Sequence, residues 1–289
     1  MRKLYRNAKK IDKFLISFLK KQKKSLLVTP MKYGIISGGK KIRSTVIFDA
    51  GKIFKISEKE LINICAAVEC IHSYSLIHDD LPCMDNDSMR RGKPSTHIKF
   101  GEASAVLAGS SLLTLAFEII TDKNYSLNAK SKNEIVRSLA SCSGHTGIAG
   151  GQELDLKYEK KKKTIYQIID MQRKKTGKLF NFCLYAVGVI ANKSKKEKIF
   201  LRALGEEIGL LFQLTDDFLD SKGSKKQVGK LVKKDSKKGK STLLSSLGEK
   251  KAYLYANNLR KKILLKLKKH GKKANELIST IEFILERRF

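Results

Sequence analysis

Apolar residues recur at intervals of three and four along almost the whole chain, as in Leu61, Ile64, Cys65, Val68 and Ile71. This spacing places them on one face of an α-helix, whereas the alternation typical of strands is hard to find. The pattern predicts an all-α protein, a single-domain helical bundle over residues 1–289. The expected helices are 6–24, 34–55, 59–81, 101–121, 131–149, 164–191, 197–221, 241–268 and 274–287.

Two long connections interrupt this pattern, at residues 82–100 and 222–240. The first holds two of the three prolines, the second holds nine lysines, and each follows an acidic cluster directly. Long loops carry function more often than helix faces do, although a lysine-rich loop can equally be plain solvated chain.

Composition indicates a globular protein, because 42% hydrophobic residues are too many for a disordered chain. The longest nearly apolar run, residues 179–191, is shorter than the about 20 residues that span a bilayer, so we expect no transmembrane segment. The basic N-terminus carries a helical stripe broken by polar residues, which argues against a signal peptide. Five cysteines without C-x-x-C spacing indicate reduced thiols and a cytoplasmic protein.

The formal net charge of +32 would attract polyanions at long range. Most of the excess is lysine in irregular runs, with few aromatic residues between them to stack on bases. This arrangement favours a bias of composition over a nucleic-acid surface, and we expect no nucleic-acid partner.

An acidic segment, "QLTDDFLD", ends a strongly helical stretch. Its Asp216 and Asp220 are four residues apart, so they share one face of the helix, with Gln213 close to it. Two carboxylates then point at one place.

The other acidic segment, "HDDLPCMD", comes first along the chain and has a different spacing. Asp79 and Asp80 precede Asp85 by a distance that would scatter the three on an ideal helix. Pro82 breaks that helix, and an irregular helix end could curl Asp85 and Asp87 back toward Asp79.

Clustered carboxylates repel one another unless a cation lies among them. Oxygen ligands favour a hard ion such as Mg²⁺, which takes one or two carboxylates and completes its shell with substrate phosphates. Each cluster could instead be a solvated helix end. Both, however, are followed by cations, Arg90 and Arg91 after the first and Lys230 and Lys240 after the second. Metal and cations together predict a substrate that carries phosphate.

A third segment, "GGKKIR" at residues 38–43, opens a predicted helix. Its glycines could allow a diphosphate to approach closely, with Lys40 and Arg43 about one turn apart on a common face. Taken alone, this segment could equally be the ordinary start of a helix with no role in binding.

These segments, together with "ECIHSYSLIHDDLPCMDNDSMRRGKPSTH" and "KTGKLF", occur in an order and spacing that resembles the trans-isoprenyl diphosphate synthases, most closely the bacterial farnesyl diphosphate synthases. The resemblance implies an isoprenoid synthase fold around a deep cavity, usually in a homodimer. It implies a prenyltransferase that condenses dimethylallyl and geranyl diphosphates with isopentenyl diphosphate.

The resemblance also assigns roles to residues. The Mg²⁺ ligands, for three ions per active site with substrate bound, would be Asp79, Asp80, Asp85, Asp216, Asp217 and Asp220, with Asp87 as a further candidate. Isopentenyl diphosphate would be bound by Gly39, Lys40, Arg43, His72 and Arg91. The allylic diphosphate would be bound by Arg90, Lys175, Lys240 and Lys230. The oxygens of Thr176 and Gln213 would face the developing cation, and the residues acting in catalysis would be Asp79, Asp80, Lys175, Thr176, Gln213 and Asp216.

Product length would depend on Tyr74 and Ser75, just before the first aspartates. Periodicity turns Tyr74 away from the face of Asp79, so a plain core tyrosine remains an alternative. By resemblance, the aromatic residue and the proline-containing insertion in the first acidic segment indicate a C15 product, farnesyl diphosphate. A geranyl or geranylgeranyl product is the alternative.

Two other functions remain open on the residues alone. A metal phosphohydrolase could use His78 and Asp79, but it would leave the second acidic segment unexplained. A nucleic-acid-binding protein would use the positive charge without any need for Mg²⁺.

Overall fold

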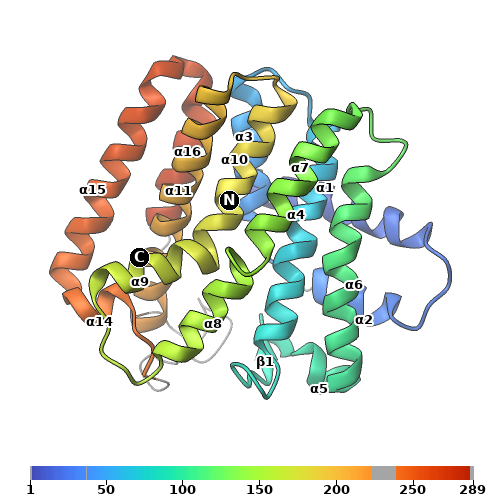
Figure 1. Cartoon of the computed structure of the whole chain (residues 1–289), viewed down its shortest axis with the longest axis horizontal. Coiled ribbons are helices and arrows are strands. Elements are labelled where there is room, and N and C mark those ends of the chain that lie inside the picture. Colours follow the sequence, from blue (N-terminus) through green and yellow to red (C-terminus); the bar gives the residue numbers. More distant parts are fainter. Residues whose placement is uncertain (1, 37, 223–238, 287–289) are drawn as a thin grey trace. The chain divides into compact units, whose positions relative to one another are not determined.

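The computed structural model describes residues 2–36, 38–222 and 239–286, and almost all of its regular structure is helical (Figure 1). The chain folds into two compact units. Unit 1 covers Met1–Phe48 and Ser57–Val136, and unit 2 covers Asp49–Ile56 and Arg137–Phe289. The all-α prediction is confirmed, while one domain over residues 1–289 stays a prediction.

Unit 1 is built around one long buried helix, α4. Its helices are α1 (Arg2–Lys20), α2 (Val28–Ile35), the first part of α3 (Ile42–Ile53), α4 (Glu58–Asp79), α5 (Thr96–Phe100), α6 (Glu102–Thr121) and the first part of α7 (Ala129–Ser143). α4 starts at a capping box formed by Ser57 and Glu60, which satisfies backbone N–H groups at the helix start. It packs against α1, α2 and α6, and its Leu61, Ile64 and Ile71 are almost fully buried.

Unit 2 centres on α10 and α11, which pack along each other (Figure 1). Its elements are α8 (Ile148–Tyr158), α9 (Ile165–Gln172), the π-helical turn η1 (Arg173–Gly177), α10 (Lys178–Ile190), α11 (Lys195–Lys222), α14 (Leu243–Leu247), α15 (Glu249–Leu267), the 3₁₀ segment η2 (Lys268–Ala274) and α16 (Asn275–Glu286). Phe180, Phe182 and most other residues of α10 are buried, so the longest nearly apolar run of the sequence lies in the core of unit 2.

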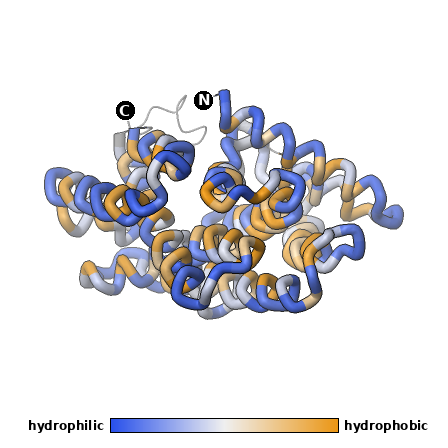
Figure 2. Tube along the Cα trace, turned by 90° about the horizontal axis from the view of Figure 1, so that it is seen from above, coloured by the Kyte–Doolittle hydropathy of each residue, from blue (hydrophilic) through white to orange (hydrophobic). Residues whose placement is uncertain are grey.

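Most helices are amphipathic, and Figure 2 shows hydrophobic and hydrophilic residues alternating around their turns. This agrees with the spacing read from the sequence. Two helices, α4 and α6, are long and apolar enough to cross a membrane by length and composition alone. Most of α4 is buried inside the protein, whereas less than half of the apolar part of α6 is buried.

Several predicted helix boundaries were wrong, mainly where glycines lie. The helix expected at 34–55 begins only at Ile42, after a turn in which Gly38 and Gly39 both have positive φ, and the short helix α2 before that turn was not predicted. The helix expected at 131–149 ends at Ser143, and α8 follows it, unpredicted because Gly150 and Gly151 lower helix propensity. Gly248 separates α14 from α15 within the range 241–268.

The connection at residues 82–100 has more regular structure than expected. Strands β1 (Met89–Arg90) and β2 (Lys93–Pro94) form a short antiparallel ladder there, and α5 follows. The ladder closes through a tight turn in which Arg91 and Gly92 both have positive φ. Arg90 ends β1 and bonds back to Asp80 of the first acidic segment, while Arg91 lies in the turn.

Candidate active site

The first acidic segment curls back on the end of α4. The backbone N–H of Asp85 donates to the carbonyl of Asp79 at 2.8 Å, and that of Asp87 donates to the carbonyl of Asp80 at 3.0 Å. Asn86 lies between them with a φ of 48°, in the left-handed region that asparagine tolerates. The predicted return of Asp85 and Asp87 toward Asp79 is therefore confirmed.

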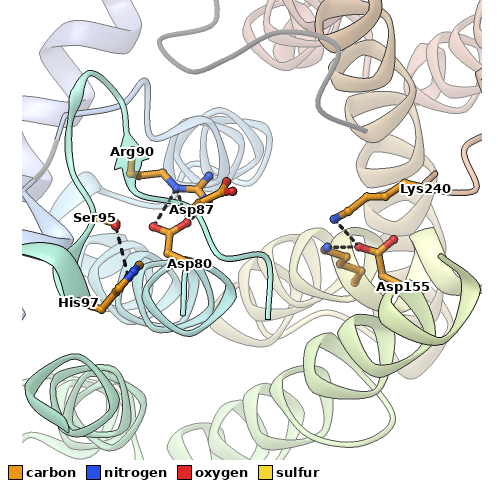
Figure 3. Close-up of polar contacts among 8 residues, drawn as sticks. Asp80, Asp87, Arg90, Ser95, His97, Asp155 and Lys240 are labelled. Atoms are coloured by element: carbon orange, nitrogen blue, oxygen red, sulfur yellow. Dashed lines mark hydrogen bonds and ion pairs between the residues drawn. The ribbon is translucent and has the colours of Figure 1, made fainter. Parts of the chain in front are cut away.

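Arg90 lies against these carboxylates (Figure 3). Its Nε is 3.0 Å and 3.1 Å from the two carboxylate oxygens of Asp80, its Nη2 also bonds to Asp80, and Nη2 lies 3.8 Å from Asp87. Burial opposes the charge of Arg90, but the bonds to Asp80 and the charges of Asp79 and Asp85 raise its pKa. Arg90 is thus the internal counter-ion of the acidic segment.

A basic group lies in the same unit. Arg91 donates through Nη1 to the carbonyl of Gly38, and a Cβ at Gly39 would come within 2.7 Å of the Arg91 guanidinium. A side chain at Gly39 would be strained by the φ of 139° and would push the Arg91 guanidinium aside. Burial, then the charges of Arg43 and Arg91, hold the pKa of His72 well below its usual value. Positive groups gathered in this way favour an anion.

The prediction that Lys40 and Arg43 share a helix face was wrong. α3 begins at Ile42, so Lys40 lies in the glycine turn before the helix, where it is exposed. Arg43 lies in the first turn of α3 and is buried. Lys40 therefore extends from a turn and Arg43 from a helix, and the two do not lie on one face of the same helix.

Sequence reasoning missed the residues that hold this turn in place. Lys41 is buried, with its Nζ 3.2 Å from Asp12 and 4.0 Å from Glu69. Ser44, on α3, donates to the same Glu69 at 2.7 Å. This buried network joins the start of α3 to α1 and α4. No spacing along the chain indicates it, because its members come from three separate helices.

In unit 2, the π-helical turn η1 carries Lys175 and Thr176. Such turns are rare and occur frequently at functional sites. The Thr176 hydroxyl donates to Gln213 Oε1 at 2.7 Å, and Gln213 Nε2 donates to Asp217 Oδ1 at 2.9 Å. The other oxygen of Asp217 accepts from Gln172 Nε2 at 3.0 Å. Asp217 therefore fixes the orientation of the Gln213 amide, and Gln172 is a contributor that sequence reasoning missed.

The second acidic segment lies in the last turns of α11. Asp216 and Asp220 are four residues apart within that helix, as predicted, with Asp216 partly exposed and Asp220 buried. The Gln213 amide bonds to the neighbouring Asp217. One helix end thus offers three carboxylates in two consecutive turns.

Lys175 and Lys240, also in unit 2, are brought together by Asp155 (Figure 3). Lys175 Nζ is 2.6 Å and Lys240 Nζ is 3.0 Å from the same oxygen, Oδ2 of Asp155. Sequence reasoning missed Asp155 because its helix, α8, was itself not predicted. Lys230 lies outside the residues that the structure describes.

Tyr74 and Ser75 lie in the last turns of α4. The Tyr74 ring packs edge-on against His78 with ring centroids 5.0 Å apart, and burial, then the charge of Asp79, raises the pKa of Tyr74. The Ser75 hydroxyl donates to the carbonyl of His72 in its own helix at 2.9 Å. Of the pair, Tyr74 is the one with a bulky side chain near Asp79.

His78, the residue on which a phosphohydrolase would depend, is used in packing. Its Nε2 lies 3.0 Å from the Val106 carbonyl of α6. A Cβ at Gly109, also on α6, would collide with that nitrogen, so the ring lies directly on the helix backbone. These contacts with α6 occupy the ring and give no support to a catalytic role.

The carboxylates fit Mg²⁺ by their chemistry. Within residues 2–36, 38–222 and 239–286, no three His, Cys, Asp or Glu side chains form a ready metal-binding group. Mg²⁺ needs no complete protein cage, because it keeps waters and binds substrate phosphates. All the candidate ligands are oxygens, and zinc would require His or Cys among them.

Comparison with known proteins agrees with this chemistry. Residues 24–282 match the family model for polyprenyl synthetase. Farnesyl diphosphate synthase of Bacillus subtilis is 41% identical over 226 residues, 78% of this chain and 75% of that protein. An FPP/GFPP synthase structure from Zymomonas mobilis is 35% identical with a TM-score of 0.87, covering 98% of this chain and 97% of that one. A Helicobacter pylori geranyltransferase structure, complexed with magnesium and isoprenyl diphosphate, is 30% identical with a TM-score of 0.84, covering 98% and 95%. The chain belongs to the polyprenyl synthetase family.

Proposed function

We propose that this polyprenyl synthetase is a farnesyl diphosphate synthase, which joins dimethylallyl diphosphate and then geranyl diphosphate head-to-tail to isopentenyl diphosphate. The observation that carries the proposal is the pairing of acids with cations in both units. Asp80 is bound to Arg90 in unit 1, and Asp155 is bound to Lys175 and Lys240 in unit 2. The names of the similar proteins support the same reaction.

Mg²⁺ is the cofactor we assign to the two acidic segments, where it would act as metal ions do in other phosphoryl clamps. The resemblance to the trans-isoprenyl diphosphate synthases implies three ions with substrate bound. The proposed ligands are Asp79, Asp80 and Asp85 of the first acidic segment and Asp216, Asp217 and Asp220 of the second. When bound, the metal would neutralise the diphosphate that leaves the allylic carbon. The magnesium in the Helicobacter pylori structure supports this choice of ion.

The side chains divide between the two substrates. Arg90, Lys175 and Lys240 would neutralise the departing allylic diphosphate, and Thr176 and Gln213 would turn oxygens toward the allylic cation. The basic group near the glycine turn would bind isopentenyl diphosphate through Gly39, Lys40, Arg43, His72 and Arg91. The alkene of isopentenyl diphosphate attacks the cation, and the released diphosphate can take the proton that is then lost. No protein base is therefore needed.

The identity of the product is tested by incubating the protein with dimethylallyl and isopentenyl diphosphates. We expect farnesyl diphosphate as the main product with Mg²⁺, almost no product after EDTA treatment, and recovery when Mg²⁺ is restored, because carboxylate ligands bind it reversibly. Chromatography and mass spectrometry of the dephosphorylated alcohols give the chain length. A C10 or C20 main product would refute the C15 assignment, and release of inorganic phosphate without a new carbon-carbon bond would indicate a phosphohydrolase.

We also place the enzyme in the cytoplasm, as a homodimer. The support for a dimer is an exposed apolar face on α6, where Val106 and Leu107 are 42% and 53% exposed. Ala103, Ser110 and Thr114 extend the same face at helical spacing, and all are exposed. A face of small and apolar residues fits the same face of a second copy around a two-fold axis.

Leu107→Glu is expected to convert a dimer to a monomer, because two charges would be buried opposite each other across the two-fold axis. Light scattering coupled to gel filtration measures the change in mass. Leu254→Glu, at a leucine of α15 that is 59% exposed, is the matched control and should leave the dimer intact. A wild-type monomer, or a dimer that survives Leu107→Glu, would contradict this arrangement.

A further inference from the structure

Asp155 is a buried carboxylate between two of the lysines assigned to the allylic diphosphate. Its residue exposure is 6%, and its Oδ2 accepts hydrogen bonds from Lys175 Nζ at 2.6 Å and Lys240 Nζ at 3.0 Å (Figure 3). Burial would raise the pKa of Asp155, but the two lysine charges and their hydrogen bonds lower it. The carboxylate is therefore ionised, and the three groups together carry one net positive charge.

The two ammonium groups would repel each other without this carboxylate. Both lie within 3.0 Å of one oxygen atom, so they are close neighbours in a partly buried place where charges are weakly screened. Their side chains are long and have many rotamers, and only an anion at this position makes the paired arrangement favourable. Asp155 thus sets where both lysines point.

α8, the helix of Asp155, also fixes the backbones that carry the two lysines. Gly151 lies one turn before Asp155, and a Cβ there would collide with the backbone nitrogen of Lys175. The absence of a side chain at Gly151 lets η1 pack directly on α8.

The backbone around Lys240 is held at the other end of α8. Lys160 N–H donates to the Gly239 carbonyl at 2.8 Å. The Ser241 hydroxyl lies 3.2 Å from the Tyr158 carbonyl and 2.8 Å from that of Lys161. Both neighbours of Lys240 are therefore tied to the turn after α8, within reach of Asp155.

We propose that Asp155 is a positioning residue for prenyl transfer, which holds Lys175 and Lys240 side by side so that both meet the departing allylic diphosphate. The inference rests on the proposed assignment of these lysines. Asp155 acts through the lysines, since both ammonium groups bond to its Oδ2. The net positive charge of the three groups remains available to attract the negatively charged diphosphate.

The test is Asp155→Asn, which keeps the size of the side chain and removes its charge. We expect kcat/KM for geranyl diphosphate to fall by about 10- to 100-fold, as for other small misplacements of reacting groups. The KM for isopentenyl diphosphate should stay within about twofold, because its proposed ligands lie elsewhere. Glu153→Gln is the matched control, since it removes the same charge from an exposed ion pair with Lys157 on the same helix. It should change neither constant.

A mutant cycle separates positioning from a merely structural role. Lys175→Ala should cost much less activity in the Asp155→Asn background than in wild type, because the lysine is no longer held in place. Thermal unfolding is followed in parallel. If Asp155→Asn does not fold, Asp155→Glu, which retains the charge but shifts it by one methylene, should fold and show an intermediate loss.

Each other outcome overturns the inference. The inference fails if Asp155→Asn keeps the wild-type kcat/KM, or if it raises the KM for isopentenyl diphosphate as much as that for geranyl diphosphate. It also fails if the losses of activity in Asp155→Asn and Lys175→Ala simply add in the double variant, or if Asp155→Glu loses no activity. In each of these cases the proposed function still stands. If wild type and Glu153→Gln form no prenyl product at all, the proposed function fails and this inference fails with it.

Discussion

Asp80→Asn is expected to lower kcat/KM by about a thousandfold, an effect typical of losing one charged group at a reacting centre. It is also expected to lower the free energy of unfolding by about 2 kcal/mol, the usual cost of weakening a hydrogen bond to a charged group. Both effects follow from one carboxylate. Asp80 is 2% exposed, bonds to Arg90 through both oxygens, and is a proposed Mg²⁺ ligand.

Asp170→Asn serves as the control for Asp80→Asn. Asp170 pairs with Lys174 one turn away in an exposed position, and such pairs contribute about 0.5 kcal/mol or less. Steady-state kinetics and urea unfolding measure both variants. An Asp80→Asn enzyme that is less stable but fully active would assign Asp80 a structural role only, and one that is equally stable would contradict the importance of its bond to Arg90.

Tyr74→Ala is expected to change the main product from C15 to C20 or longer. Tyr74 lies five residues before Asp79 on α4, and its ring is held edge-on by His78. His78 is in turn fixed against α6, so the tyrosine ring cannot easily turn aside. Removing the ring leaves space beside the end of α4 into which a growing apolar chain can extend.

Tyr74→Phe is the control for the effect of the ring, because it keeps the volume and removes only the hydroxyl. It should still give a C15 product, whereas Tyr74→Ala should not. Radiolabelled isopentenyl diphosphate and chromatography of the products give the distribution of lengths. An unchanged C15 product from Tyr74→Ala would show that this tyrosine only packs, the alternative that periodicity left open.

The sequence allowed the long helices to be predicted, because α4, α6 and α11 each carry apolar residues at intervals of three and four over several turns. It also allowed the return of Asp85 toward Asp79 to be anticipated, since a proline after a helix end restricts the local backbone. Both features are determined by residues close together in the sequence, so the spacing of residue types is enough to predict them.

What could not be predicted depends on contacts between distant segments. α8 contains paired glycines that lower its helix propensity, and the reason for one of them, the close approach of η1 to Gly151, appears only in the folded unit. Asp155 was missed for the same reason, because its two lysines lie far from it in sequence. The prediction that Lys40 lies on the same helix face as Arg43 was wrong, because a pair of glycines in the sequence does not show at which residue the next helix begins.

The π-helical turn η1 has a consequence for how this protein can vary. It lies within one continuous helical rod that runs from α9 through α10, and a π turn accommodates one residue more than an α turn. Deleting one residue there would restore a regular helix and leave α10 facing α11 almost as before, because a π turn takes up its extra residue within a single turn. The side chains inside the turn would change place, so the added residue sets the direction of Lys175 and not the packing of α10.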